Sequence, residues 1–499
     1  NITVNVTDVN EAPVINSSPA FNVAENTTFV GLLTVNDPDG PPSNFTITGG
    51  ADAGLFQISP DGKVLLFNGI PDFEGAHGNS YQVEVTGNDG TNASAPQMIT
   101  VNVTNQSTHL VGDGSANSLS AGSVSPVEEA LIEGLGGNDT MFGGTGLDTM
   151  IGGEGNDYYN VGAGDQVTEE IDGGADFVSS STTSLNLVDY ANVEHLQTYG
   201  NGSGINLTGS SGNNAIYSEQ NIEANILTGL GGNDSYIVGN GDTIVEGADQ
   251  GFDWVSSSTI SLDLADYANV EALNTFGSKS GINLTGNNAN NTLHAENNSQ
   301  ANVLTGLGGN DFYIVGASDT IVETATGGTD WVASASIDLD LVNYANVENI
   351  RLRSAGPQNA TGSGSANVII GGAGANVIAG GGGNDILTGG LGADTFVMNA
   401  VLNAATNVDR ITDFTQADDT IWLENTGAGL FNGLTTTGTL DATAFTTGTA
   451  AADGDDRIIY NTLTGDLFYD SDGTGASAAQ LFARLNPGTA LANDDFSVV

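Results

Sequence analysis

Seven nine-residue segments of this sequence carry glycines and one aspartate at fixed positions. Residues 143–151 read GGTGLDTMI, and residues 152–160, GGEGNDYYN, follow directly. Glycine lets the backbone turn through positive φ and bring carbonyl oxygens close together, and the aspartate in the sixth position adds a carboxylate at the same point. Ca²⁺ takes roughly six to eight oxygen ligands, whereas Mg²⁺ demands a tighter octahedral shell. The spacing therefore predicts Ca²⁺ sites between stacked turns.

The predicted Ca²⁺ ligands are the sixth-position aspartates and the glycines of the tandem segments. They are Asp139, Asp148, Asp157, Asp234, Asp311, Asp385 and Asp394, with Gly134, Gly137, Gly143, Gly146, Gly152, Gly155, Gly380, Gly383, Gly389 and Gly392. We expect the most complete sites at residues 134–160 and 380–397, where segments lie in tandem. Asp234 and Asp311 lie in single segments, so incomplete ligand sets are expected there.

Eight further nine-residue frames depart from the pattern at the sixth position. One carries Ala130, and seven carry asparagine, namely Asn117, Asn214, Asn225, Asn291, Asn302, Asn367 and Asn376. Asparagine can stack in ladders without holding a charged ion, so we expect structural coils with weak or absent Ca²⁺ there. A glycine-rich solenoid without any metal is the alternative interpretation of the whole pattern.

The charge of the chain limits its partners and chemistry. Its 499 residues include 7 Lys+Arg against 60 Asp+Glu, which gives a net charge of −53, and there is no Cys. Nucleic acid and anionic membrane surfaces are bound through basic residues, so neither is expected as a partner. Disulfide and thiol chemistry are excluded. No stretch offers the roughly 20 apolar residues that a membrane span needs.

A second, longer period of 77 residues runs through the middle of the chain. Phe177, Trp254 and Trp331 follow it, and the segment YANVE returns at residues 190–194, 267–271 and 344–348. Three near-copies over roughly residues 134–361 predict a stacked array in which each repeat contacts its neighbours. The two tryptophans are interpreted as stacked aromatics of the coil, with an aromatic platform for sugars as the alternative.

Residues 10–105 read as a β-sandwich. Alternating β-branched residues predict strands at residues 28–35, 44–48, 63–67 and 81–86, separated by Gly, Pro, Asn and Asp. The sequence ITVNVT occurs at residues 2–7 and again at residues 99–104. We therefore interpret residues 1–9 as the last strand of a preceding repeat, and the chain as the C-terminal part of a longer protein.

The glycines become sparse after residue 397. Short apolar runs around residues 411–423, 458–460 and 467–469 predict strands, and residues 477–485 have the apolar spacing of a helix. We expect residues 398–499 to form a β-rich domain that caps the array. The predicted fold class is thus all-β: a sandwich over residues 10–105, a parallel β-roll or β-helix over residues 106–397, and the cap.

Residues 112–397 resemble the hemolysin-type RTX repeat, G-G-x-G-x-D-x-U-x. The resemblance implies Ca²⁺-filled parallel β-rolls, export by the type I secretion machinery, and folding outside the cell. The region 398–499 is similar to the C-terminal target domain of such proteins. That similarity rests on residues 389–397, on DRITDF at 409–414 and on LFYDSDG at 467–473.

Residues 10–105 look like a cadherin-type repeat because acidic and amide residues follow their strands. The resemblance implies that Asp8, Asn10, Glu11, Asp37 and Asp39 bind Ca²⁺ at an upstream junction, and that Glu25, Asp72 and Glu74 do so at the following one. The following linker, residues 105–108, has no carboxylate, which puts Ca²⁺ at that junction in question. Ordinary turn acids are the alternative interpretation.

Together these features predict an extracellular or cell-surface Ca²⁺-binding protein with a structural or adhesive role. The sequence contains no G-x-S-x-G, H-E-x-x-H or P-loop motif, so no catalytic role is predicted for this chain. One alternative is the non-catalytic RTX tail of a secreted protease, lipase or polysaccharide-modifying enzyme. Another is a self-assembling surface-layer or matrix filament. Expected partners besides Ca²⁺ are another protein, copies of the chain itself, or surface polysaccharide.

Overall fold

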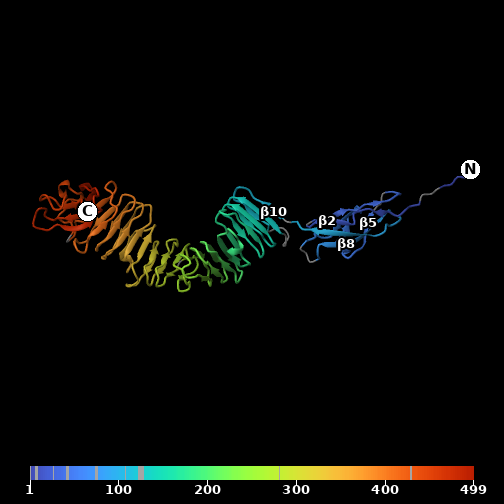
Figure 1. The fold of residues 1–499 in the computed structure, drawn as a ribbon, viewed down its shortest axis with the longest axis horizontal. Helices are drawn as coiled ribbons and strands as arrows, with labels where there is room; N and C mark the ends of the chain where they lie inside the picture. Colours follow the sequence, from blue (N-terminus) through green and yellow to red (C-terminus); the bar gives the residue numbers. More distant parts are fainter. Residues whose placement is uncertain are drawn as a thin grey trace. The chain divides into compact units, whose positions relative to one another are not determined.

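The computed structural model describes residues 2–5, 9–25, 27–40, 44–73, 77–106, 108–121, 129–279, 281–427 and 430–499. Within these ranges the chain is built from β-strands and has no α-helix, which confirms the predicted all-β class (Figure 1). It divides into two units, residues 1–183 with 188–193 and residues 184–187 with 194–499. The short 3-10 turns are η1 (Ala53–Leu55), η2 (Leu187–Asp189), η3 (Leu341–Asn343), η4 (Ala442–Ala444) and η5 (Asn493–Asp495).

The first unit begins with a sandwich of two sheets in the orders β2-β9-β8-β5 and β3-β7-β6, and a separate pair β1-β4. The strands are β1 (Val14–Ile15), β2 (Ala20–Ala24), β3 (Phe29–Leu32), β4 (Val35–Asn36), β5 (Asn44–Gly49), β6 (Phe56–Ile58), β7 (Val64–Phe67), β8 (Ser80–Asn88) and β9 (Gln97–Thr104). The strands predicted in this region are confirmed. Residues 2–5 lie outside any strand.

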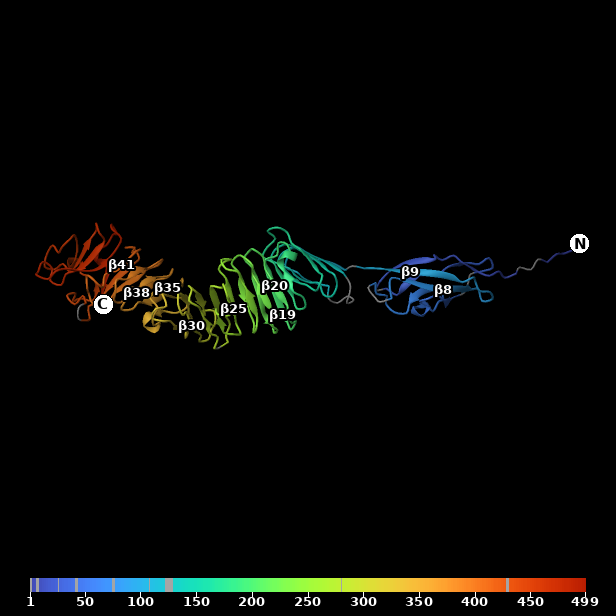
Figure 2. The same ribbon diagram turned by 60° about the horizontal axis from the view of Figure 1, so that its bottom comes forward.

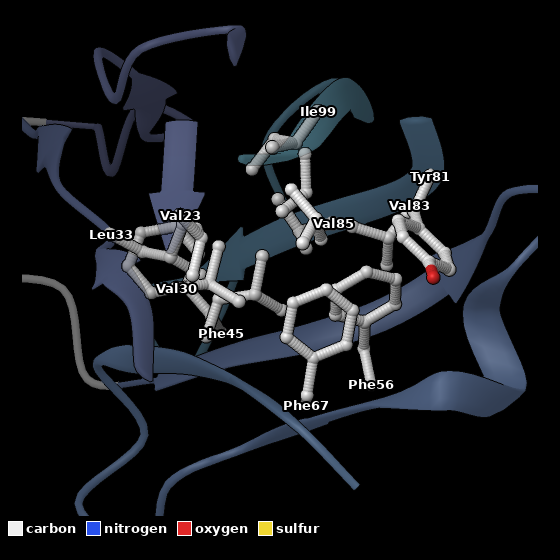
Figure 3. Close-up of a cluster of buried hydrophobic side chains, with 13 residues drawn as sticks. Val23, Val30, Leu33, Phe45, Phe56, Phe67, Tyr81, Val83, Val85 and Ile99 are labelled. Carbon is white, nitrogen blue, oxygen red and sulfur yellow. The ribbon is translucent and has the colours of Figure 1, made fainter. Parts of the chain in front are cut away.

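The sandwich core follows from the alternation of apolar residues along its strands. In β8, Tyr81, Val83 and Val85 point inward and are buried, whereas Ser80 and Gln82 are exposed. Figure 3 shows these side chains meeting Phe56 and Phe67 from the opposite sheet. The rings of Phe56 and Phe67 stack with centroids 4.5 Å apart. This core forms without any contribution from glycine-rich sequence.

The first unit continues as a parallel coil with two ladders, β10-β12-β14-β16 and β11-β13-β15-β17. Its strands are β10 (Thr108–Val111), β11 (Ser118–Ser120), β12 (Ala130–Gly136), β13 (Thr140–Phe142), β14 (Thr149–Glu154), β15 (Tyr158–Asn160), β16 (Gln166–Thr168) and β17 (Phe177–Ser180). Met141 pairs with Tyr159, 18 residues later. Two nine-residue segments therefore make one coil, and each supplies one of its two strands.

The second unit continues with parallel ladders on both sides of the coil (Figure 2). One ladder contains β19 (His195–Gly200), β21 (Ala215–Asn221), β23 (Ser235–Ile237), β25 (Trp254–Ser257), β27 (Ala272–Thr275), β29 (Thr292–His294), β31 (Phe312–Ile314), β33 (Trp331–Ser334), β35 (Asn349–Leu352), β37 (Val368–Ile370), β39 (Ile386–Thr388) and β41 (Asp409–Ile411).

The facing strands form three shorter sheets. They are β18 (Leu185–Asn186), β20 (Asn206–Thr208), β22 (Ile226–Thr228) and β24 (Thr243–Val245); β26 (Leu262–Asp263), β28 (Leu284–Thr285), β30 (Val303–Thr305) and β32 (Thr320–Val322); and β34 (Leu339–Asp340), β36 (Gln358–Thr361), β38 (Asn376–Ala379), β40 (Thr395–Met398), β42 (Thr420–Leu423), β48 (Phe496–Val498) and β43 (Gly438–Thr439).

The eighth residue of each nine-residue segment fills the interior of the coil. Met141, Met150 and Tyr159 in the first unit and Tyr236, Tyr313, Leu387 and Phe396 in the second are fully buried. The aromatics of the 77-residue period have a different position. Trp254 and Trp331 open strands β25 and β33 and are half-buried on the outer side of the coil. This position agrees with coil-surface aromatics and leaves an aromatic platform for sugars open as the alternative.

The predicted helix at residues 477–485 is wrong. The segment contains β47 (Gln480–Arg484), which pairs antiparallel with β46 (Asp466–Tyr469) and parallel with β41. The other strands of this region are β44 (Phe445–Thr447) and β45 (Ile458–Asn461). Short apolar runs fit either element, and the exposed edges of β41 and β46 supply backbone partners that an isolated helix would leave unused.

The second residue of the nine-residue segments has a positive φ. Glycine occupies this position at Gly144 (φ 95°), Gly153 (φ 100°), Gly381 (φ 86°) and Gly390 (φ 98°), but leucine occupies it at Leu135, Leu230 and Leu307, with φ between 77° and 79°. A left-handed conformation costs an L-residue about 1–2 kcal/mol. The coil therefore holds these three leucines in a backbone conformation that is unfavourable for them.

Replacing Gly381 by Ala is expected to destabilise the coil by about 1–3 kcal/mol, because the strained φ is joined by a clash with the backbone carbonyl of Ser363. Leu230→Ala, at the same position of another segment, is the matched control and is expected to change stability by less than about 1 kcal/mol. Denaturant unfolding in Ca²⁺ measures both. Equal effects would show that the neighbouring coil does not restrict this position.

Candidate metal centres

The seven sixth-position aspartates all lie in the turn that precedes a strand of the coil. Asp139, Asp148, Asp157, Asp234, Asp311 and Asp385 are each 1% exposed, and Asp394 is 2% exposed. Carboxylates are rarely buried to this extent unless they are paired or bind a metal. Their hydrogen bonds therefore decide what the site can do.

One oxygen of each aspartate holds the preceding coil. Asp157 Oδ1 accepts a hydrogen bond from the backbone N–H of Asp139 at 2.7 Å, and Asp139 Oδ1 accepts one from Asn117 at 2.7 Å. Asp234 Oδ1 accepts in the same way from Asn214 at 2.7 Å. Because the bond always joins equivalent positions of successive coils, the aspartates form a ladder along the array.

The second oxygen has no hydrogen-bond donor among the described residues. This holds for Oδ2 of Asp139, Asp148, Asp157, Asp234, Asp311 and Asp385. A Cβ placed on Gly134 or Gly380, the first residue of the segment, would fall on this oxygen. The same point near Gly134 lies 2.8 Å from the carbonyl oxygen of Gly152. Glycine thus keeps open a gap lined by carboxylate and carbonyl oxygens, which fits a Ca²⁺ ion.

The fourth-position glycines serve a different purpose. Gly137, Gly155, Gly383 and Gly392 have φ between 94° and 126°. A Cβ on each would meet the backbone of the preceding coil, at Ser115 for Gly137 and at the Gly137 carbonyl for Gly155. Gly146 is half-buried in the same turn. Gly143 and Gly389 repeat the first-position arrangement beside Asp148 and Asp394. The fourth-position glycines therefore allow close stacking.

In most coils, asparagine in the sixth position uses both of its side-chain polar atoms in hydrogen bonds. Nδ2 of Asn291, which has no acceptor among the described residues, is the exception. Asn214 Oδ1 accepts from the N–H of Ser210 at 2.7 Å, and its Nδ2 donates to the carbonyl of Glu194 at 2.8 Å. Asn376 makes the equivalent bonds to Gly372 and Gln358, both at 2.8 Å. An amide provides both a donor and an acceptor, whereas a carboxylate only accepts. These bonds support the prediction that asparagine coils need no ion.

Three groups of three acids lie deeper in the coil, and the predicted ligands include only one member of each. They are Asp157, Glu169 and Asp176; Asp234, Glu246 and Asp253; and Asp311, Glu323 and Asp330. Within each group the ligand oxygens lie within 4.8 Å of one another. They supply further carboxylates to Asp234 and Asp311, whose ligand sets were expected to be incomplete. The missed residues recur at the 77-residue spacing, which would have revealed them.

The end of the array continues the ladder with aspartates from outside the nine-residue pattern. Asp409 Oδ1 accepts from the N–H of Asp385 at 3.2 Å, and Asp419 Oδ1 accepts from Asp394 at 2.9 Å. Asp413 accepts from the N–H groups of Gly389 and Gly390, both at 2.8 Å. The segment DRITDF, which carried the resemblance to a secretion target domain, thus positions carboxylates over the last coils.

Burial raises the pKa of these carboxyl groups. It raises the pKa of Asp148 and Asp394 to about 6, of Asp234 and Asp311 to about 7, and of Glu169 to about 8. Neighbouring carboxylates add to the effect, with Asp176 and Asp157 acting on Glu169. The raised pKa values mean that, without a metal ion, these carboxyl groups lose their protons less readily than exposed carboxyl groups do.

The predicted ligands of the sandwich form two groups. Asp39 Oδ2 accepts from the N–H of Glu11 at 2.6 Å, and Asp37 Oδ1 accepts from that of Asp39 at 3.0 Å. Asn10 donates instead to Asp89, at 2.7 Å. Glu25, 1% exposed, accepts from the N–H groups of Phe73 at 2.9 Å and Gln106 at 2.7 Å. Asp72 is half-buried beside Phe73. Asp8 and Glu74 lie outside the described residues.

Comparison with known families identifies two kinds of module in the chain. The RTX calcium-binding nonapeptide repeat (four copies) matches residues 133–165 and 361–396, and the bacterial Ig domain matches residues 10–102. RTX nonapeptide repeats bind Ca²⁺, and the acidic groups of this structure are able to hold ions. No curated protein matches the chain. Among the described residues, no helical segment has the length and apolar character needed to cross a bilayer.

Several solved cadherin structures resemble part of the chain. Human protocadherin-24 EC1-2 is 17% identical, with 21% of this chain and 53% of that chain covered and a TM-score of 0.18. Drosophila N-cadherin EC1-4 is 17% identical, with 21% of this chain and 30% of that chain covered and a TM-score of 0.17. The chain spans about half the length of the first structure.

Asp139→Asn is expected to lower the number of bound Ca²⁺ ions and to stabilise the metal-free coil by about 1–3 kcal/mol, because it removes a buried oxygen that lacks a donor. Ca²⁺ binding by equilibrium dialysis measures the first effect, and the TMAO concentration needed to fold the metal-free coil in EDTA measures the second. Glu154→Gln, an exposed acid of the same array, is the control and should change neither. If Asp139→Asn bound as many Ca²⁺ ions as wild type, Asp139 would not be a Ca²⁺ ligand.

Acidification in EDTA is expected to favour the folded coil. The pKa values of Asp148, Asp234, Asp311 and Glu169 are raised to about 6, 7, 7 and 8, above unfolded values of about 4. Their stabilisation is therefore complete below about pH 4 and is lost as the pH rises through 6 to 8. Circular dichroism from pH 8 to pH 5 measures the gain. A fold that loses β-structure on acidification in EDTA would contradict the assignment.

Proposed function

We propose that this chain is a Ca²⁺-dependent structural segment of a secreted or cell-surface protein, in which an adhesive Ig-like domain precedes a coil that becomes rigid on binding ions. The observation that carries the proposal is the repeated Asp Oδ2 atom, buried between coils and without a donor. RTX repeats and bacterial Ig domains are typical of extracellular proteins. Both are typically non-catalytic modules, and we assign no reaction to this segment.

The free energy of ion binding is large enough to control folding. Extracellular Ca²⁺ modules have a Kd of roughly 10⁻⁴ M. At about 1 mM free Ca²⁺, one such site adds about 1.4 kcal/mol to the free energy of unfolding, and seven add about 10 kcal/mol. A whole domain is stable by only about 5–15 kcal/mol. The ions therefore decide whether the coil folds.

The same dependence suits export of an unfolded chain. At the low Ca²⁺ concentration of a cytosol, the buried carboxylates repel one another and the coil does not form. We propose that the type I secretion machinery exports the chain in this state, with residues 398–499 as its target domain. Support for this part comes from the sequence resemblance of residues 389–397, 409–414 and 467–473. Folding then follows on the outside.

A Ca²⁺ titration of EDTA-treated protein tests the proposal. We expect a cooperative gain of β-structure in circular dichroism and a fall in hydrodynamic radius near millimolar Ca²⁺, without an equal response to Mg²⁺. The sandwich is an internal control, because its core contains no glycine repeat and should be folded at all Ca²⁺ concentrations. A coil that is already folded in EDTA at neutral pH would refute the proposal.

A further inference from the structure

The 77-residue period brings one set of four side chains together three times. Each set contains a triad of acids and a tyrosine: Tyr159 with Asp157, Glu169 and Asp176; Tyr236 with Asp234, Glu246 and Asp253; and Tyr313 with Asp311, Glu323 and Asp330. In each set the tyrosine hydroxyl donates a hydrogen bond to the glutamate. The other tandem segments have Met141, Met150, Leu387 or Phe396 in the eighth position.

The coil register explains how the glutamate enters the gap. Thr168 pairs with Ile151, so Glu169 follows directly over Gly152, the first residue of its segment. The pairs Thr228–Val245 and Thr305–Val322 place Glu246 over Gly229 and Glu323 over Gly306 in the same way. The glutamate therefore stands where a tandem array would have another first-position glycine, and its carboxylate takes the place of that glycine's bare carbonyl.

Three side chains converge on one point in each set. A Cβ built on Gly152 would fall on the Asp157 carboxylate, the Tyr159 hydroxyl and the Glu169 carboxylate together. The equivalent point at Gly229 meets Asp234, Tyr236 and Glu246, and at Gly306 it meets Asp311, Tyr313 and Glu323. The gap is therefore lined mainly by side-chain oxygens.

Oxygens without a donor point to a missing ligand. Oδ2 of Asp157, Asp234 and Asp311 has no hydrogen-bond donor among the described residues, and each of these side chains is 1% exposed. In the described part of the chain, the ion pairs His109–Glu133, Arg353–Glu296 and Arg484–Asp466 include no acid of the second and third triads. A cation from solution would balance the clustered carboxylates in their ionised form.

The YANVE segments position the triads. Asn192, Asn269 and Asn346 adopt φ of 63°, 63° and 64°, and each donates from Nδ2 to the backbone carbonyl of the triad glutamate, Glu169, Glu246 or Glu323, at 2.9 Å. Glu271 and Glu348 accept from the N–H groups of Asp253 and Asp330 at 2.9 and 2.8 Å. The repeated motif of the sequence thus fixes the triad glutamate in all three copies, and also the second triad aspartate in the second and third copies, by hydrogen bonds.

We propose that each 77-residue repeat holds one Ca²⁺ ion in its Asp–Glu–Asp triad, as a class of site separate from the carbonyl-lined gaps between tandem segments. The triad residues of the second and third copies lie outside the matched RTX segments, residues 133–165 and 361–396. An oxygen-only set of three carboxylates selects a hard cation. The inference rests on the proposed function for the identity of the ion, but it adds where and how the non-tandem coils bind it.

Single and combined Glu→Gln variants of the full chain test the triads. We expect E169Q, E246Q and E323Q each to lose one Ca²⁺ per chain in equilibrium dialysis, and the triple variant to lose three. E170Q is the matched control, because Glu170 is the exposed neighbour of buried Glu169 and its change of charge is the same. It should retain the full ion count.

Two further readouts separate an ion site from a structural role. Tb³⁺ in the triad should give tyrosine-sensitised emission, because a tyrosine hydroxyl lies beside each triad. The triple Glu variant should lose this emission and E170Q should keep it. In EDTA the metal-free coil can be folded by adding the osmolyte TMAO. The triple Glu variant should need less TMAO than wild type, because neutral amides replace three clustered carboxyl groups. A merely structural glutamate would raise the TMAO concentration needed in EDTA and lower the melting temperature in Ca²⁺.

The outcomes distinguish this inference from the proposed function. If wild type folds with Ca²⁺ but the triple Glu variant keeps its ion count and Tb³⁺ emission, the triad sites are refuted and the proposed function stands. A triple variant that needs more TMAO than wild type to fold in EDTA also refutes them. If wild type binds no Ca²⁺ and gains no structure, both proposals fail.

Discussion

A buried carboxylate with one satisfied oxygen and one without a donor is the constraint on which the coil depends. Oδ1 of Asp157 holds the backbone N–H of Asp139, so the aspartate contributes to the spacing of coils. The same bond fixes Oδ2 in a gap from which water is excluded. A side chain that accepts this backbone hydrogen bond through one oxygen must also bury the other oxygen. Burying it costs free energy unless the side chain is neutral or an ion is present. On the proposed function, Ca²⁺ is therefore part of the fold rather than an addition to it.

The sequence predicted the elements whose pattern is local, and missed those that only the coil brings together. The alternation in β8 and the glycine–aspartate segments each signal their structure within about ten residues, and the predictions based on them agree with the structure. Glu169 and Asp176 lie 12 and 19 residues beyond Asp157, and only the parallel register places them together. The helix predicted for residues 477–485 is wrong for the opposite reason. Their local spacing fits a helix, but pairing with β41 and β46 makes the segment a strand.

Asparagine and aspartate both occupy the sixth position of the nine-residue segments, but their side chains bond differently there. Asn376 Oδ1 occupies the place beside Gly371 that Asp385 Oδ2 occupies beside Gly380. The amide binds the N–H of Gly372 and the carbonyl of Gln358, so its coil closes without an ion. The aspartate carboxylate leaves Oδ2 available to bind an ion. On the proposed function, the ratio of aspartate to asparagine along the array thus sets how much of the coil's stability depends on Ca²⁺. A coil made only of asparagine would fold without Ca²⁺.

The 77-residue repeat places a side-chain carboxylate where the nine-residue repeat places a backbone carbonyl. Equivalent aspartates are 18 residues apart in the tandem coils, but Asp157 and Asp176 are separated by 19, as are Asp234 and Asp253. In the triad coils the residue over the first-position glycine is a glutamate. Its carboxylate reaches back over Gly152, Gly229 or Gly306 in place of a glycine carbonyl, and the tyrosine hydroxyl fixes its direction. Because this ligand comes from a side chain, it adds a carboxylate to the gap that the backbone of a tandem coil does not provide.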